Sequence, residues 1–149
     1  MLWTNRGKKL LFDYVFQGVT LPTHFYVALV TSAVAPTADT NTLSQLTEIA
    51  NGNGYTTGGY ELHPDTTDFD YILEDDALDK AILQIKNLIW TATGGPIPVS
   101  GNPARYAVLL DNNVTVGSRQ VICAWDLGGS VSVTEGLPIA LADCQLEAA

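Results

Sequence analysis

The fold is decided by residues 89–146, IWTATGGPIPVSGNPARYAVLLDNNVTVGSRQVICAWDLGGSVSVTEGLPIALADCQL. This stretch alternates short apolar runs with segments rich in glycine, proline and asparagine. Strands of this length at such regular spacing are typical of a β-sandwich or barrel. The chain contains no evident nucleophile–base set, metal-ligand spacing or phosphate loop. The sequence therefore predicts a mainly β protein that binds another molecule and is not an enzyme.

The N-terminal residues differ from this pattern and predict a helix over residues 4–17. Thr4 or Asn5 can cap its start, and Gly18 can end it in a left-handed conformation. One helical face carries apolar residues at the three-and-four spacing, namely Leu10, Leu11, Tyr14 and Val15. We expect a single domain, 1–149, with a helical attachment segment at 1–18 and a β-sandwich body at 19–149.

Further elements follow from local composition. Strands are predicted at 23–32, 80–92 and 137–146. Tight turns are expected at residues 112–113, 128–129 and 135–136. Residues 51–60 hold four glycines and two asparagines, which predicts either a flexible loop or a hairpin whose Asn-Gly pairs take positive φ.

Composition limits the partners. The formal net charge is −9 and charged residues make up only 15% of the chain, against about a quarter in most globular domains. An acidic body repels phosphates, so nucleic acid is not an expected partner. No run approaches the ~20 apolar residues that a membrane span needs. The low charge suggests that part of the surface is covered by neighbours, although an uncharged polar surface would give the same composition.

The densest charge lies in residues 65–79, which contain seven carboxylates. Clustered carboxylates suit calcium, but the spacing does not match the EF-hand loop. We expect an acidic solvated loop, or a surface that faces basic residues of a partner.

The remaining polar candidates predict no metal and no cofactor. His24 and His63 are far apart in the sequence and have no local His or Cys partner, so they are interpreted as ordinary strand-end residues. Asp111 and Asp126 end predicted strands, where carboxylates accept backbone hydrogen bonds. No catalytic residue is assigned.

Cysteine and tryptophan side chains are interpreted as packing groups. Cys123 and Cys144 are expected to be buried free thiols, with a disulfide as the alternative. Trp90 and Trp125 lie in apolar runs and are expected to pack in the core or at an interface. Tryptophan rings also leave open a carbohydrate-binding module.

The N-terminal segment supplies the predicted contact with another chain. A large ring so close to the chain start gains stability only if something covers it, and basic side chains follow it. The predicted partner-contact residues are Trp3, Arg6, Lys8, Lys9, Leu10 and Tyr14.

The order of several segments resembles small structural proteins of tailed bacteriophages. These segments are NRGKKLLFDYVFQG, THFYVALVTSA, LSQLTEIANGNGY, IWTATGGPIP, ARYAVLLDNN and VICAWDLGGSVSVTEG. The resemblance implies a virion protein made in the host bacterial cytoplasm, with a β-sandwich or jelly-roll-like body and no catalysis.

Within that resemblance, the expected function is capsid decoration. Such a cement protein, here expected to be a homotrimer, binds and stabilises the lattice of the major capsid protein. A tail tube, baseplate or fibre-attachment subunit is the alternative within the same class.

Overall fold

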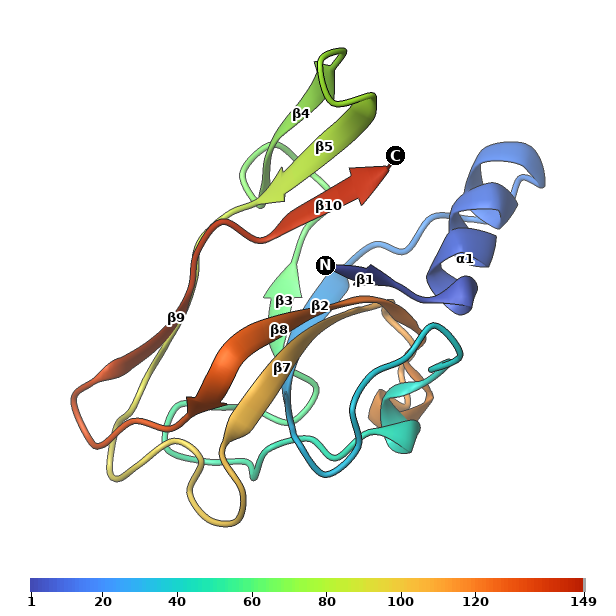
Figure 1. The fold of residues 1–149 in the computed structure, drawn as a ribbon. Coiled ribbons are helices and arrows are strands. Elements are labelled where there is room, and N and C mark those ends of the chain that lie inside the picture. The colour runs from blue at the N-terminus through green and yellow to red at the C-terminus, as the bar shows by residue number, and fades with distance from the viewer. Residues whose placement is uncertain (149) are drawn as a thin grey trace.

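The computed structural model describes residues 1–148 and shows a mainly β protein with one N-terminal helix (Figure 1). The helix is α1 (Asn5–Phe16). The strands are β1 (Leu2–Trp3), β2 (Phe25–Thr31), β3 (Tyr60–Leu62), β4 (Phe69–Asp75), β5 (Lys80–Ile85), β6 (Leu88–Thr91), β7 (Ala104–Leu110), β8 (Val121–Val131), β9 (Pro138–Leu141) and β10 (Gln145–Ala148). Two short 3₁₀ helices, η1 (Leu43–Gln45) and η2 (Val116–Ser118), complete the described elements.

The strands form three antiparallel sheets, none closed into a barrel. The largest has the order β1-β8-β7-β2-β3, the second has the order β10-β5-β4, and the third pairs β6 with β9. The predicted mainly β class and the N-terminal helix are therefore confirmed.

The centre of the five-stranded sheet is buried on both faces. Along β2, Val27 and Leu29 face the main core, which also contains residues of β5, β6, β9 and β10. The alternate residues Ala28 and Val30 face a second cluster, which Leu43 closes from η1. A strand buried on both sides reads as a continuous apolar run, as FYVALV does here.

Helix α1 begins and ends as its sequence predicts. The Thr4 hydroxyl accepts the N–H of Gly7 at 2.8 Å, which caps the first turn, and donates to the carbonyl of Val121. Gly7 lies directly on β8, because a Cβ there would come within 2.1 Å of the Ile122 carbonyl oxygen. Gly18, with a φ of 66°, follows the last turn.

Of the two alternatives predicted for residues 51–60, the structure shows the tight Asn-Gly turn. Gly52 and Tyr55 exchange both backbone hydrogen bonds around a tight turn. Its two central residues, Asn53 and Gly54, have φ of 53° and 103°. Residues 51–60 therefore contain a tight Asn-Gly turn.

Two predicted single strands are each divided between sheets. Residues 80–92 break after Ile85, because the N–H of Lys86 bonds to the carbonyl of Asp68 and β6 then pairs with β9. Residues 137–146 break at Asp143, whose φ of 55° turns the chain between β9 and β10.

Two predicted irregular segments are strands. Gly128 and Gly129 lie inside β8, where a bulge replaces the predicted turn. The acidic loop predicted at 65–79 contains β4, which pairs with β5 as a hairpin. Apolar residues interleaved with the acids, such as Tyr71 and Leu73, give this segment its strand preference.

Within residues 1–148, no helix combines the length and the apolar character that crossing a membrane would require.

Candidate functional site

Helix α1 leaves much of its apolar surface uncovered. Leu10 is buried on the sheet, but Phe16 is 77% exposed. Phe12 and Phe16 pack ring against ring at 6.2 Å on the outer side of the helix. The predicted apolar stripe is thus divided, with one part against the body and the other facing outwards.

The β4–β5 hairpin exposes apolar side chains at the same end of the molecule. Ile72 is 79% exposed, and its neighbours on the hairpin are also uncovered. Figure 1 shows the hairpin and α1 both projecting at this end. We call these exposed residues the apolar end, which comprises Leu11, Phe12, Val15, Phe16, Val19, Leu21, Tyr71, Ile72, Leu73 and Leu78.

A groove of about 560 Å³ separates the helix from the hairpin. Leu11 and Tyr14 line it from α1, and Ile72 lines it from β4. Core residues that include Leu109 and Leu146 also line it. The lining is almost wholly apolar, so the groove suits an apolar segment of a partner better than a charged substrate.

The predicted contact residues comprise two that line the groove, the ring of Trp3 and three basic side chains. Tyr14 and the buried Leu10 line the groove. Burial, assisted by the nearby carboxylates of Asp111 and Asp13, raises the pKa of Tyr14, so its phenol stays protonated at neutral pH. The ring of Trp3 has a partner within the chain, because its indole N–H donates to the carbonyl of Glu147 at 2.6 Å.

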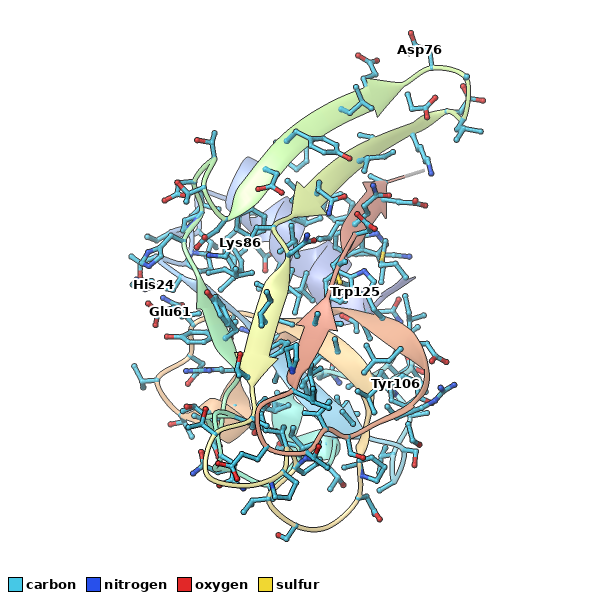
Figure 2. The ribbon with its side chains drawn as sticks, turned by 90° about the vertical axis from the view of Figure 1, so that its left-hand side faces the viewer. His24, Glu61, Asp76, Lys86, Tyr106 and Trp125 are labelled. Carbon is cyan, nitrogen blue, oxygen red and sulfur yellow. The ribbon has the colours of Figure 1, made fainter. Side chains whose placement is uncertain are left out.

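The three basic side chains lie on the first turns of α1. Arg6 donates to the side chain of Gln120, and Lys9 pairs with Asp13 at 2.5 Å. Lys8 is exposed. The helix start is therefore basic, whereas the hairpin tip carries Glu74, Asp75, Asp76 and Asp79; Figure 2 labels Asp76 at that tip.

Sequence reasoning missed the hairpin as part of the apolar end. Its apolar residues are interleaved with carboxylates, so the charge density concealed the strand. The side chains of Phe12 and Phe16, at i and i+4, were a visible signal of a second helical face.

Three of the seven acidic residues of 65–79, Asp65, Asp68 and Asp75, bind groups of the chain itself. Asp65 and Asp75 accept backbone N–H groups of the turns that follow them. Burial opposes ionisation of Asp68, but the backbone N–H of His63 and the Lys86 ammonium outweigh it and lower the pKa of Asp68.

The predicted packing groups are confirmed. Trp90 and Trp125 are buried. Cys123 and Cys144 are buried free thiols, and burial raises the pKa of both, that of Cys144 to about 11. Asp111 follows β7 and accepts backbone N–H groups, as expected at a strand end. Asp126 lies inside β8, so its predicted place at a strand end is wrong, although it accepts the N–H of Gly128 at the bulge.

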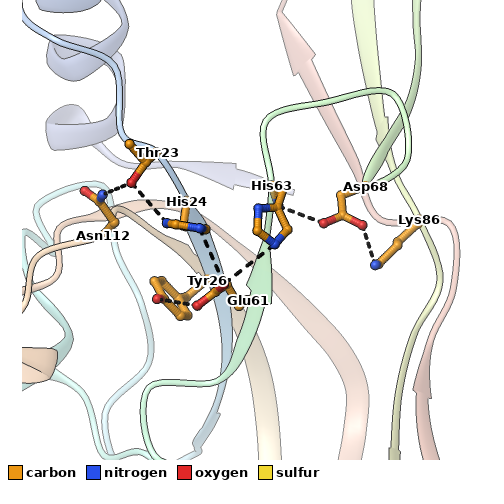
Figure 3. Close-up of polar contacts among 8 residues, drawn as sticks. All are labelled: Thr23, His24, Tyr26, Glu61, His63, Asp68, Lys86 and Asn112. Carbon is orange, nitrogen blue, oxygen red and sulfur yellow. Dashed lines mark hydrogen bonds and ion pairs between the residues drawn. The ribbon is translucent and has the colours of Figure 1, made fainter.

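The two histidines, separated by 39 positions in sequence, lie together in space. Their rings are 4.7 Å apart, centroid to centroid, and Glu61 lies between their Nε2 atoms (Figure 3). Among the described residues, His24, Glu61 and His63 are the group whose ligand atoms converge closely enough to hold a metal ion. No local sequence signal indicates this convergence, because it depends on strand pairing.

The chain matches no known family model, no curated protein and no solved structure, so its geometry is what supports a function.

Proposed function

We propose that this chain is a non-catalytic structural protein of a tailed bacteriophage that decorates the capsid by binding the major capsid protein. The observation that carries the proposal is the apolar end, where a helix and a hairpin expose large apolar side chains around a groove. Exposed apolar side chains gathered about a groove in this way mark sites of protein–protein contact.

Charge at the apolar end favours self-assembly in the same particle. The helix start is basic and the hairpin tip is acidic. If the helix of one copy faces the hairpin of the next, both apolar surfaces are buried and the charges are complementary. A head-to-tail contact forms a ring when its rotation closes, and we propose a closed homotrimer.

The proposal includes a jelly-roll-like β-sandwich body. In support, one face of the five-stranded sheet packs against residues of β6 and β9 in a common core. The other face is covered by the segments around η1 and η2. A rigid body of this kind would hold the apolar end in a fixed orientation.

The two alternative functions, a tail subunit and a carbohydrate-binding module, require different surfaces. A tail tube, baseplate or fibre-attachment subunit could use the same apolar end, so location in the particle separates it from capsid decoration. A carbohydrate-binding module needs an exposed ring platform, and the burial of Trp90 and Trp125 does not favour it.

Electron microscopy of intact phage particles, with the chain labelled by a specific antibody, tests the proposal. Label spread over the head supports capsid decoration. Label restricted to the tail supports the alternative, and particles without label contradict both.

A variant pair tests the role of the apolar end. We expect the double variant Phe12→Ser and Phe16→Ser to sediment as a monomer and to lose binding to capsids. Val114→Ser changes a residue that is 97% exposed outside the apolar end, so it should behave as the wild type. Equal assembly of both variants in analytical ultracentrifugation would contradict the proposed interface.

A further inference from the structure

Strand register brings three potential metal ligands onto one face of the large sheet. In the antiparallel pair of β2 and β3, Tyr26 lies opposite Glu61. Continuing this register by two residues places His24 opposite His63. Because side chains alternate along a strand, the four residues share one face. Figure 3 shows both imidazoles directed at the Glu61 carboxylate.

The distances are close to those of a metal site. Glu61 Oε1 lies 3.5 Å from His24 Nε2 and 3.7 Å from His63 Nε2. Zinc bonds of about 2.0–2.1 Å in a tetrahedron imply ligand atoms about 3.3 Å apart. The third separation, between the histidines, is at most 4.8 Å. The two histidine side chains are 34% and 54% exposed, which leaves them room to adjust around an ion.

We propose that His24, Glu61 and His63 bind a divalent transition-metal ion, with Zn²⁺ as the reference ion. Two imidazole nitrogens and one carboxylate oxygen favour zinc and its neighbours over calcium or magnesium. The three side chains leave further coordination positions open to solvent, where water would complete the shell. The inference does not depend on the proposed role in a phage particle.

Surrounding hydrogen bonds orient two of the ligands. Tyr26 donates its hydroxyl to Glu61 Oε2 at 2.7 Å, and this hydrogen bond raises the pKa of Tyr26. Oε1 remains directed at the histidines. On the other side, His24 Nδ1 lies 3.0 Å from the Thr23 hydroxyl oxygen, which accepts from Asn112 at 3.1 Å. A Nδ1–H directed at this oxygen leaves Nε2 free to bind a metal.

The third ligand is held through its backbone. The N–H of His63 donates to Asp68 Oδ2 at 2.7 Å, and Lys86 pairs with the other oxygen of that carboxylate. Hydrogen bonds that support metal ligands typically change metal affinity about 10–100-fold. His63 is therefore held at the site by its backbone, whereas contacts to the side chains orient His24 and Glu61.

A bound ion would also fasten an edge strand. β3 has three residues and lies at the edge of the five-stranded sheet, paired only with β2 among the described strands. Because His24 and His63 flank that pairing on opposite strands, a metal that joins them links the strands. Binding only to the folded chain stabilises it in proportion to the logarithm of the metal concentration.

Calorimetric titration of the untagged, chelator-treated chain with ZnCl₂ tests the proposal. We expect one Zn²⁺ per chain and a rise in the melting temperature. His63→Ala and Glu61→Gln should each weaken binding at least about tenfold, the size of change that even supporting contacts produce. Glu135→Gln, at an exposed acid outside the site, serves as the control and should bind as the wild type does.

Two further measurements keep the test decisive. NMR of the wild-type imidazoles should show both histidine rings shifting together on addition of Zn²⁺, which does not depend on any variant folding. Ca²⁺ and Mg²⁺ should leave the rings unchanged. Absence of Zn²⁺ binding, unchanged affinity in the ligand variants, or equal binding of Ca²⁺ would overturn the proposal.

Discussion

Apolar side chains are buried in the five-stranded sheet but exposed at the apolar end. In the sheet, Val27, Leu29 and Val108 are completely covered by the chain itself. At the apolar end, Phe16 and Ile72 are more than three-quarters exposed. The sheet is therefore stabilised from within, whereas the helix and hairpin retain apolar surface that the chain itself does not cover. Substitutions should separate these two roles.

The largest effect on stability is expected in the sheet. Leu29→Ala should lower the free energy of unfolding by about 2–5 kcal/mol, because it leaves a cavity in a fully buried position. Phe16→Ala removes a larger side chain from an exposed position and should change the stability of the dissociated monomer by less than about 0.5 kcal/mol. Urea unfolding of both variants measures the contrast, and equal losses would show that the two regions do not differ as described.

A smaller loss is expected where the two regions meet. Gly7→Ala places a Cβ within 2.1 Å of the Ile122 carbonyl oxygen, so α1 must move away from β8. Overpacking of this kind costs about 1–3 kcal/mol. Limited proteolysis should cut the helix faster than in the wild type. Gly129→Ala is the control, since a Cβ added there meets nothing within 4 Å and the φ of Gly129 is not positive.

The smallest expected effect is a difference between the two regions in how stability depends on pH. Asp68 at the base of the hairpin has a lowered pKa, so its contribution to stability is present above its ordinary value of 3.8 and is lost as pH falls through the folded-state pKa. Asp68→Asn should lower stability at neutral pH by about 1–2 kcal/mol and make the loss of stability in acid shallower.

The pKa of Glu48, beside the sheet, is shifted in the opposite direction from that of Asp68. Burial raises its pKa, although Tyr55 and the N–H of Gly58 donate to it. The wild type should therefore lose stability as pH rises from 4.5 through the folded-state pKa of Glu48, and Glu48→Gln should reduce that loss. Thermal unfolding from about pH 3 to 8 compares the two carboxylate variants. Parallel pH profiles for both would contradict the opposite environments.

Features that depend only on residues close together in the sequence could be predicted from it. The cap at Thr4, the end of the helix near Gly18, strand β2 and the turn at Asn53–Gly54 all follow from side-chain and backbone preferences of a few residues. The points after Ile85 and at Asp143 where the chain passes from one sheet to another could not be predicted locally. They depend on which strand pairs with which.

The same limit applies to the sites. Histidines 24 and 63 meet only because β2 pairs with β3 in one particular register. A shift by one residue would place His24 opposite the other face of β3. The division of the helix stripe also required the structure, since periodicity shows that a face is apolar but does not show how much of it the body covers.

The cap of α1 has a consequence for synthesis. Thr4 and the β8 carbonyl that it contacts are separated by 117 positions in the chain. On the ribosome, the helix is therefore made long before its support exists, and Leu10 stays exposed until β8 emerges. Contacts of such long range slow folding and extend the interval in which apolar surface is open to aggregation. Until Val121 and Ile122 have been made, neither the carbonyl that supports the cap of α1 nor the surface that receives Gly7 exists.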